Sequence, residues 1–405
     1  MAYLANSSNL KLGNKMRQEQ TYCVYTYNYP FIDNDGYVAL CCKNTHHKLP
    51  YHISEYSLEY IWNSPEMLEV RRQFEASEEP KGCFKCYQPE RDGVRSFRQK
   101  TLGMINKGTP FEDNAIRALD LRLGNICNLR CTMCFAGNSN RIYQRLPEMA
   151  EHFGWTEKQL NNQLDKHQAK YFDWADREQA WENIMSAVTP ELRHVYLAGG
   201  EPFYLKNFIG TVERIGNIAT NAKFVINSNG TRLLRDKDLE KFEGKKIYIR
   251  LSVDGWGKAD EFTRQETVWE EKLKVMDQYY EHFDIDAWDI TANAFSVRHI
   301  PQLMDYINNR YPRTQIQVRP VVNKTELLLN NIPEHFRTEA LEYLTDYHNT
   351  HRFTGLDHVI QQLEIPYEDD PKVKEKMKTF VTYYNNTGAV KLNEFDKELS
   401  DWLFA

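Results

Sequence analysis

The chain has 405 residues, of which 41% are hydrophobic and 13% aromatic, and its formal net charge is -6. This length favours two domains, or one domain with large appendages, and the acidic balance gives no global positive field that would attract nucleic acid or an anionic membrane. The opening segment 1–20 lacks the apolar core of a signal peptide, and no run approaches the roughly 20 apolar residues of a membrane span, so we expect a soluble, cytoplasmic protein.

All the cysteines lie in the first third of the chain. They are Cys23, Cys41, Cys42, Cys83, Cys86, Cys127, Cys131 and Cys134. In a chain expected in a reducing compartment, such crowding favours metal binding, and a disulfide framework is the alternative.

The region 1–115 is rich in cysteines and turns, which predicts a small metal-organised module. Four thiolates, from Cys23, Cys41, Cys83 and Cys86, satisfy a closed metal site. Cys41 and Cys42 are adjacent and would point to opposite faces of a strand, so only one of them is expected to ligate, and we favour Cys41. Structural zinc is one reading of this site, with His46 and His47 as reserve ligands.

From residue 116 onward, short strand-like segments alternate with longer amphipathic stretches, which predicts βα units and a parallel sheet. Six strands are expected, at 117–125, 194–200, 223–230, 246–255, 289–297 and 315–322. The insertion 155–188 is expected to be helical and mostly solvent-facing, and 326–405 is expected to be a helical extension.

Each expected strand has one apolar and one polar side. In the fourth strand, Ile247, Ile249 and Leu251 alternate with Tyr248, Arg250 and Ser252. A partial (β/α)6 TIM-like barrel, with apolar sides toward outer helices and a polar lumen, accounts for this pattern. An antiparallel sheet with one wet face gives the same alternation, but the long connections disfavour it. We therefore predict an α/β fold with a cysteine-rich module (1–115), a partial barrel (116–325) and a helical extension (326–405).

Cys127, Cys131 and Cys134 follow the first barrel strand directly, at the end where β/α-barrel active sites are built. A [4Fe-4S] cluster normally takes four thiolates, so three would leave one iron open to a small molecule. A zinc knuckle is the structural alternative, but it needs a fourth ligand, and none lies close in the sequence. The segment GGEP at 199–202 ends the second strand.

The spacing C-x-x-x-C-x-x-C at 127–134, followed by GGEP, resembles the radical S-adenosylmethionine (SAM) enzymes. NSNG at 227–230 and SVDG at 252–255 resemble further segments of that superfamily, although Met133 stands where its members often have an aromatic residue. Cys23, Gly36-x4-Cys41 and the C-x-x-C at 83–86 resemble the auxiliary-cluster modules called twitch or SPASM, which usually follow the barrel rather than precede it.

The resemblance implies a [4Fe-4S] cluster on the cysteine triplet, S-adenosyl-L-methionine bound to its open iron, and reductive cleavage to a 5'-deoxyadenosyl radical that abstracts a substrate hydrogen. It also implies a second [4Fe-4S] cluster on the four N-terminal cysteines and an electron donor such as flavodoxin or ferredoxin. The implied SAM-binding residues are Gly199, Gly200, Glu201, Pro202, Asn229, Ser252, Asp254 and Arg264.

The resemblance also suggests how these residues contact SAM. The GGEP backbone would accept from the methionyl amine, Ser252 and Asp254 would bond ribose or amino-acid groups, and Arg264 would pair with the carboxylate. For Asn229 a capped turn, and for Arg264 a surface ion pair, are equally weighted structural readings.

The expected reaction is oxidation or dehydrogenation of a small polar substrate, and peptide or protein modification is the close alternative. A non-catalytic iron-sulfur electron carrier and a zinc-stabilised interaction module are the readings outside this chemistry. Arg250 and Arg319 are candidate substrate contacts, although Arg250 could instead pair with Asp120 inside the barrel. The basic stretch Arg91, Arg95, Arg98 and Lys100 is either a solvated face, a set of charges that offsets the auxiliary cluster, or a receiver for an anionic substrate group.

Overall fold

The computed structural model describes residues 22–101, 114–351 and 356–405. The opening segment 1–20, for which we expect no signal peptide, lies outside the described residues, as do 102–113 and 352–355.

The strands form one nine-stranded sheet in the order β3-β2-β1-β4-β5-β6-β7-β8-β9. They are β1 (Phe31–Ile32), β2 (Tyr37–Ala39), β3 (Lys48–His52), β4 (Ala118–Arg122), β5 (His194–Ala198), β6 (Lys223–Ser228), β7 (Lys246–Ser252), β8 (Asp284–Ala292) and β9 (Ile316–Pro320). From β4 to β9, each strand pairs in parallel with the next along the chain. The six expected barrel strands and their parallel arrangement are confirmed, although β8 begins at Asp284, before the predicted start at 289.

Helices fill the connections. The α-helices are α2 (Val24–Tyr27), α3 (Leu58–Trp62), α4 (Pro65–Glu75), α5 (Phe84–Arg91), α6 (Phe97–Thr101), α7 (Asn140–Tyr143), α8 (Leu146–Phe153), α9 (Glu157–Lys166), α10 (Glu178–Met185), α11 (Phe208–Ile218), α12 (Asp236–Leu239), α13 (Lys258–Thr263), α14 (Trp269–His282), α15 (Ile300–Arg310), α16 (Thr338–His351), α17 (Leu356–Glu364), α18 (Pro371–Thr387) and α19 (Lys397–Phe404). The 3₁₀ helices are η1 (Ala169–Tyr171), η2 (Trp174–Asp176), η3 (Pro202–Tyr204), η4 (Glu240–Phe242), η5 (Val297–His299), η6 (Thr325–Leu327), η7 (Leu329–Asn331), η8 (Glu334–Phe336) and η9 (Leu392–Glu394).

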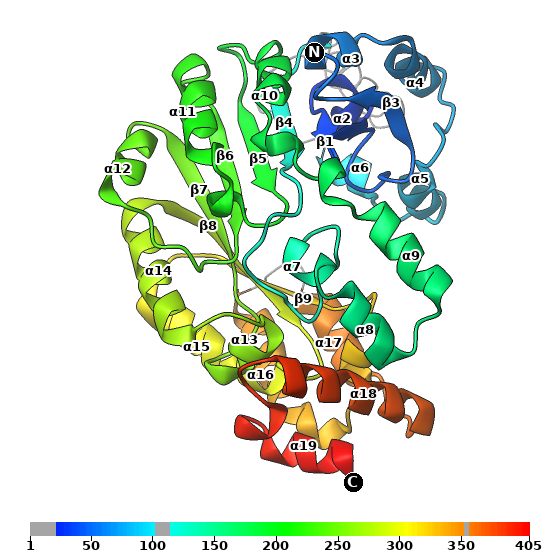
Figure 1. Ribbon diagram of the computed structural model, residues 1–405, viewed down its shortest axis with the longest axis vertical. Helices are drawn as coiled ribbons and strands as arrows, with labels where there is room; N and C mark the ends of the chain where they lie inside the picture. Colours follow the sequence, from blue (N-terminus) through cyan, green and yellow to red (C-terminus); the bar gives the residue numbers. More distant parts are fainter. Residues whose placement is uncertain (1–21, 102–113, 352–355) are drawn as a thin grey trace, which may run out of the picture.

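The sheet curves as a partial barrel that does not close, since its two edges are β3 and β9. Helices α11, α12, α14 and α15 lie along its outer side, and the C-terminal helices α16–α19 gather at one end of the molecule (Figure 1). This C-terminal part of the chain is helical over the described residues of α16 to α19. It reaches back to the barrel, where α17 packs beside β9 and α18 packs beside α8.

The barrel strands are apolar outside and polar inside, as the alternation predicts. In β7 the side chains of Ile247, Ile249 and Leu251 are buried, whereas Tyr248 and Arg250 are half-buried. The buried side belongs to one continuous core that the outer helices complete. Each fully buried leucine or isoleucine of this kind contributes about 1.5–3 kcal/mol through its removal from water.

The N-terminal module continues the barrel sheet. Strand β1 pairs in parallel with β4, with Phe31 opposite Asp120, and β2 and β3 extend the sheet in antiparallel fashion. Ile32, Trp62 and Met67 of the module share one hydrophobic core with the barrel leucines. The sheet therefore runs across the boundary that the sequence suggests near residue 115.

The insertion between β4 and β5 has two different parts. Helix α9 buries none of its residues and begins with a capping box formed by Thr156 and Gln159, as expected for a solvent-facing helix. The following stretch contradicts the expectation of a mostly solvent-facing insertion, because Trp174 and Trp181 are fully buried. Trp174 Nε1 donates to the carbonyl of Asn34 at 3.1 Å, so this stretch fastens the N-terminal module to the barrel.

Ion pairs organise the polar lumen. Arg122 pairs with Asp120 (Nε–Oδ1, 2.9 Å), and Arg250 pairs with Asp289 (2.6 Å) and Asp286 (3.0 Å). The suggested pairing of Arg250 with Asp120 is therefore wrong. Asp120 lies two residues from Arg122 on the same side of β4, whereas Arg250 on β7 faces the carboxylates of the neighbouring strand β8.

His194 opens β5, and its ring packs edge-on against Tyr29 with 5.7 Å between centroids. Burial lowers the pKa of His194 from 6.5 to about 4, and the charge of Lys223 acts in the same direction. The neutral folded histidine therefore contributes stability above pH 6.5 that is lost as the pH falls toward about 4, by at most about 3 kcal/mol. We expect His194→Gln to flatten this part of the pH dependence of urea unfolding. An unchanged dependence in the variant would contradict the assignment.

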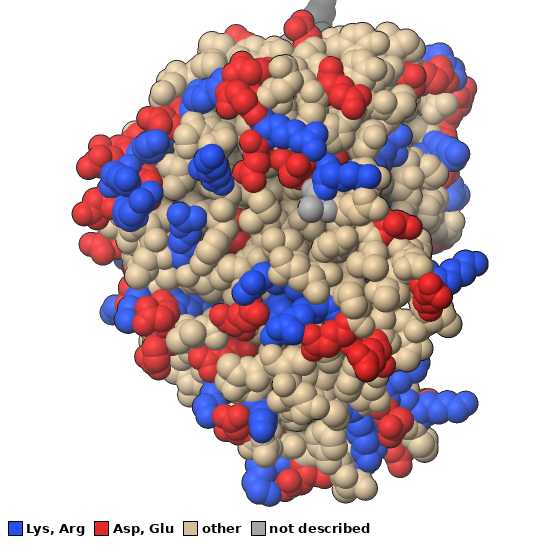
Figure 2. Space-filling model, in the orientation of Figure 1, with Lys and Arg blue, Asp and Glu red and all other residues tan. Residues whose placement is uncertain are grey.

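Within the described residues, none of the helices combines the length and apolar character needed to cross a membrane. Figure 2 shows lysine and arginine side chains interspersed with aspartate and glutamate over the visible face. This mixture agrees with the small net charge of the chain.

Candidate functional site

A cavity of about 300 Å³ lies at the carboxyl ends of the barrel strands, and all three cysteines of the triplet line it. Of the other predicted site residues, Gly199, Gly200, Asn229, Ser252 and Arg264 line the same cavity. Glu201, Pro202 and Asp254 are buried close by without lining it. The structure thus gathers motifs from four different strand ends around one space.

The cysteine loop is held by its own polar side chains. Asn140 Oδ1 accepts from the backbone N–H of Cys127 at 3.0 Å, and Ser139 Oγ donates to the carbonyl of Leu129 at 2.6 Å. Gly124 begins the loop with a φ of +80°, and a Cβ there would lie 2.1 Å from the carbonyl oxygen of Phe172. The loop conformation therefore requires glycine at the end of β4.

The GGEP segment lies against the cysteine loop. Gly200 has a φ of +51°, and an added Cβ would lie 2.2 Å from the carbonyl oxygen of Ile126. The backbone N–H of Glu201 donates to that same oxygen at 2.8 Å. The two segments touch through their main chains, which explains why small residues occupy this position.

The Glu201 side chain joins the ends of two strands. Its carboxylate accepts from the backbone N–H of Asn229 at 2.6 Å and from Ser228 Oγ at 2.9 Å. Burial raises the pKa of Glu201 to about 7, although these hydrogen bonds act in the opposite direction. Glu201 thus fixes the position of the NSNG turn relative to GGEP, a structural role that the motif alone does not reveal.

Asn229 caps its own turn and also lies at the cavity. Its Oδ1 caps the following turn by accepting from the N–H of Thr231 at 3.1 Å. Its Nδ2 donates to Asn128 Oδ1 at 2.9 Å and lies 3.9 Å from Cys127 Sγ. The side chain therefore lines the cavity and also stabilises the turn that carries it.

Arg264 reaches the cavity from the connection after α13. Its Nε donates to Asp254 Oδ2 at 2.7 Å, and its Nη1 lies 3.8 Å from Cys131 Sγ. Asp254 is fully buried, and its other oxygen accepts from the backbone N–H of Thr291 at 2.6 Å. In this structure Asp254 is buried behind Arg264 and holds it in place.

A second buried ion pair supports Asp254 from behind. Lys272 Nζ lies 2.7 Å from Asp260 Oδ2, and the two side chains are 1% and 0% exposed. Asp260 Oδ1 accepts from the backbone N–H of Asp254 at 2.8 Å. Neither residue belongs to a recognisable motif, so this support could not be identified from the residue pattern.

Lys324 is a further residue that sequence reasoning missed. It follows β9, and its Nζ donates to the carbonyls of Thr132 and Cys134 at 2.6 and 2.8 Å. It also lies 5.0 Å from the ring centroid of Phe135. Lys324 therefore binds the cysteine loop through two of its carbonyls, from the segment that follows β9.

The N-terminal module contributes Asn34 to the same cavity. Its Nδ2 donates to the carbonyl of Gly137 at 2.9 Å and to Asn138 Oδ1 at 2.7 Å. The turn DNDG at 33–36, which contains Asn34, therefore touches the end of the cysteine loop. The residues of this segment predict a turn, but they do not indicate that the turn contacts the cysteine loop.

The three thiols fit a cluster that supplies positive charge. Burial raises the pKa of the Cys127 thiol to about 12 and raises the pKa of Cys131 and Cys134 as well. Such thiols become thiolates only beside a cation, which bound iron provides. No three His, Cys, Asp or Glu side chains of the described residues converge as a single-ion site, but the thiolates of a cluster each bind a different iron.

A second cavity lies inside the N-terminal module. It is lined by Cys23, Cys41, Cys83 and Cys86 together with Tyr25, Lys43, Asn44, Phe74, Gly82, Lys85, Phe97 and Arg98. The adjacent Cys42 and the reserve ligands His46 and His47 are not among the lining residues. The four cysteines come from three separate segments, and the fold brings them to one place.

The two candidate substrate contacts differ in their surroundings. Arg250 is held by Asp286 and Asp289, and its Nη2 also donates to Gln317 Oε1 at 2.7 Å. Arg319 is exposed, and its Nη2 donates to the same Gln317 oxygen at 2.5 Å. Arg250 therefore belongs to the lumen network, whereas Arg319 faces solvent at its edge.

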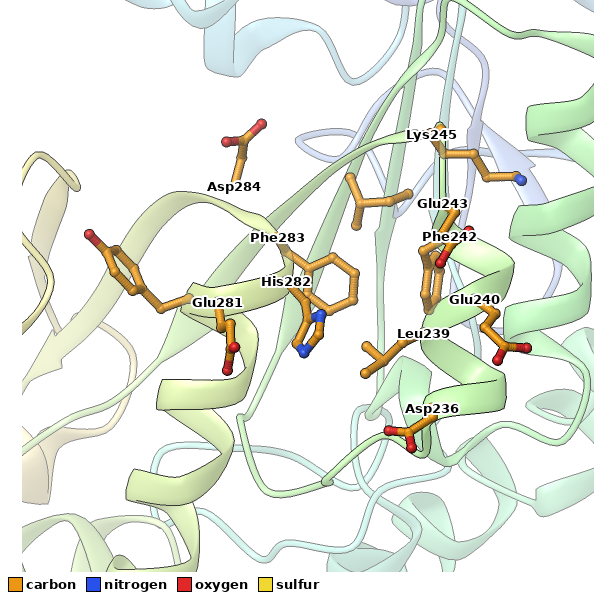
Figure 3. Close-up of a pocket in the computed structure, with 13 residues that line it drawn as sticks. Asp236, Leu239, Glu240, Phe242, Glu243, Lys245, Glu281, His282, Phe283 and Asp284 are labelled. Carbon is orange, nitrogen blue, oxygen red and sulfur yellow. The ribbon is translucent and has the colours of Figure 1, made fainter.

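A larger hollow, about 690 Å³, lies at the amino ends of β7 and β8, away from both groups of cysteines. Figure 3 shows the acidic side chains of Asp236, Glu240, Glu243, Glu281 and Asp284 around it, with His282 and Lys245. Active sites of β/α barrels form at the carboxyl ends of the strands. We therefore place the functional site at the cysteine cavity.

Two family models match the chain. That of the radical SAM superfamily matches residues 121–293. That of the iron-sulfur cluster-binding domain called SPASM matches residues 23–87. The first match begins within β4, runs past the end of β8 and contains the cysteine triplet, and the second contains Cys23, Cys41, Cys83 and Cys86.

Among solved structures, native anSMEcpe with bound AdoMet is similar at 15% identity and a TM-score of 0.40, over 56% of this chain and 59% of that one. Streptococcus suis SuiB bound to S-adenosylmethionine is similar at 14% identity and a TM-score of 0.33, over 80% of this chain and 68% of that one. The chain thus spans less than two thirds of the first of these proteins. A search of curated proteins finds no match.

Proposed function

Because the chain is a radical SAM protein with an N-terminal SPASM-type iron-sulfur module, we propose that it cleaves SAM reductively and removes a hydrogen atom from a polar substrate. The observation that carries this proposal is the single cavity shared by Cys127, Cys131 and Cys134, the GGEP glycines and Arg264. When bound, the cluster and SAM supply the electron transfer and the radical chemistry.

We infer that the chain's own residues bind and orient these groups. Cys127, Cys131 and Cys134 are the proposed ligands of the first cluster. Gly199, Gly200, Asn229, Ser252 and Arg264 are the proposed SAM contacts, while Glu201, Pro202 and Asp254 support them from behind. The Nη groups of Arg264 remain toward the cavity while Asp254 holds its Nε, a geometry that supports pairing with the SAM carboxylate.

We propose Cys23, Cys41, Cys83 and Cys86 as ligands of the auxiliary cluster. The shared cavity supports this set, and the position of Cys41 rather than Cys42 along its wall supports the choice between the two neighbours. A fully ligated cluster in this position can accept an electron from a substrate radical, which favours net oxidation.

We propose that the substrate is polar and meets Arg319 at the edge of the lumen. The ion pairs of the lumen engage Arg122, Arg250 and Lys223, whereas Arg319 is exposed beside Gln317. An arginine in this setting suits a carboxylate or another anionic group. Both a small polar acid and an acidic peptide side chain meet this requirement.

The experiment that tests the proposal is 5'-deoxyadenosine formation by the anaerobically reconstituted protein with SAM and a strong reductant. We expect formation by the parent, its complete loss in the triple variant Cys127→Ala, Cys131→Ala, Cys134→Ala, and a higher rate when a suitable anionic substrate is added. Failure of the reconstituted parent to bind SAM would overturn the proposal.

A further inference from the structure

The auxiliary cavity is lined by three basic side chains, Lys43, Lys85 and Arg98, and no Asp or Glu is among the described residues that line it. Lys43 and Lys85 are exposed, whereas Arg98 is only 3% exposed. Water and salt screen the charge of an exposed lysine strongly and that of a buried arginine much less. Arg98 is therefore the cation with the largest influence on the potential inside this cavity.

Arg98 is fixed beside the cysteines by several contacts. Its Nη1 donates to the carbonyl of Tyr22, the residue before Cys23, at 2.8 Å. Its guanidinium lies 5.2 Å from the ring centroid of Tyr87, the residue after Cys86. These two contacts hold the guanidinium between the segments that carry Cys23 and Cys86.

The other members of the basic stretch are placed differently. Arg91, Arg95 and Lys100 are exposed and do not line the cavity. Arg91 pairs with Glu79 at the surface, at 2.7 Å. The solvated-face reading therefore fits three of the four residues, and Arg98 alone turns inward.

A carboxylate on the far side of Arg98 balances its charge. Glu90 Oε2 lies 2.5 Å from Arg98 Nη2, and the Glu90 side chain is 15% exposed. Glu90 does not line the cavity, so the pair presents its positive end to the cysteines.

We propose that Arg98, oriented by Glu90, sets the reduction potential of the auxiliary iron-sulfur site. Arg98 acts as a positioning and charge-compensating residue. Reduction adds one electron to a site that four thiolates already make negative, and a buried cation stabilises this more negative state. Neutralising Arg98 should lower the midpoint potential, and neutralising Glu90 should raise it. The inference rests on the proposed ligand set of Cys23, Cys41, Cys83 and Cys86.

The test is a mediated redox titration followed by electron paramagnetic resonance. It uses the full chain carrying Cys127→Ala, Cys131→Ala and Cys134→Ala, so that only the auxiliary site gives a signal. In this background we compare Arg98→Met, Arg98→Lys and Glu90→Gln. Arg95→Met is the matched control, because Arg95 belongs to the same stretch but is exposed and away from the cavity.

We expect Arg98→Met to lower the midpoint potential of the auxiliary site by at least about 59 mV. For a one-electron couple this corresponds to a tenfold change in the ratio of reduced to oxidised sites. Glu90→Gln should shift the potential upward, while Arg98→Lys and Arg95→Met should stay near the parent. Equal potentials in Arg95→Met and Arg98→Met, or shifts of the same sign in Arg98→Met and Glu90→Gln, would overturn the inference.

Two features keep the test informative. If Arg98→Met does not fold, the other two variants still test the inference. Glu90→Gln should raise the midpoint potential and Arg98→Lys should leave it near that of the parent, a combination that a general loss of structure would not produce. Iron content and the presence of a signal in the triple variant test the ligand set by themselves. Loss of the signal in the triple variant would contradict the four-cysteine ligand set. An unchanged midpoint potential in Arg98→Met would contradict the proposed influence of Arg98.

Discussion

Replacing Lys272 by methionine is expected to lower the free energy of unfolding by about 3–5 kcal/mol. The substitution leaves Asp260 as a buried carboxylate without its cation, because Lys272 Nζ lies 2.7 Å from Asp260 Oδ2 and both side chains are almost fully buried. Burial lowers the pKa of Lys272, and the ion pair with Asp260 opposes that shift. Urea denaturation of the parent and the variant measures the difference.

The same helix offers a matched control. Lys274 pairs with Glu271 at 2.7 Å, but these side chains are 60% and 58% exposed. Lys274→Met should therefore change stability by less than about 1 kcal/mol. The double variant Lys272→Met, Asp260→Asn should recover part of the loss, since it removes the unpaired charge. Equal stabilities of Lys272→Met and Lys274→Met would show that the buried pair does not act as described.

The Lys272 pair also has a consequence at the site. Asp260 bonds the backbone of Asp254, and Asp254 holds Arg264. We therefore expect Lys272→Met to weaken SAM binding even under conditions where the variant remains folded. Such a result would link a residue outside every motif to the proposed SAM contact.

Gly200→Ala is expected to reduce 5'-deoxyadenosine formation by about 100-fold, the order of loss that follows a displacement of about 1 Å at a reacting centre. Its new Cβ would lie 2.2 Å from the carbonyl oxygen of Ile126, and its φ of +51° disfavours a side chain. Since the clash is with backbone, either GGEP or the cysteine loop must move. The assay is the initial rate with SAM and a strong reductant.

Gly210→Ala is the control for this substitution. Gly210 lies in α11, and an added Cβ there meets no atom within 4 Å. Alanine at this helical position should leave the rate unchanged and raise stability by up to about 1 kcal/mol. The auxiliary cluster should load normally in both variants, which separates a local effect at GGEP from unfolding. A parental rate in Gly200→Ala would exclude the close main-chain contact as a requirement.

Most of the architecture is predictable from the sequence because its signals are local. Alternation in segments such as 246–255 identifies strands with one apolar and one polar side, and the long connections between them imply parallel pairing. The cysteine spacings at 127–134 and 83–86 likewise need only nearby residues to be recognised. The six expected barrel strands, their parallel pairing, the outer apolar face and the polar lumen are all present in the structure.

Other features depended on partners that are distant in the sequence. The insertion 155–188 appears polar on average, yet Trp174 and Trp181 are buried because the N-terminal module supplies a surface for them. The alternation allows Arg250 a partner on β4, but the neighbouring strand β8 supplies its two carboxylate partners at 3.0 and 2.6 Å. Average composition and strand alternation cannot distinguish such partners, since the choice depends on the register between strands.

The sequence by itself determined the kinds of elements, the two groups of cysteines and the motifs by which the chain matches the radical SAM superfamily, since these follow from residue type, spacing and periodicity. The tertiary structure decided which charges face each site. It turned Arg98 inward while Arg91 and Arg95 stayed in solvent, placed Asp254 behind Arg264, and brought Lys324 to the carbonyls of the cysteine loop. Electrostatic partners are fixed by distance and burial after folding, and neither quantity is encoded in the local pattern of residues.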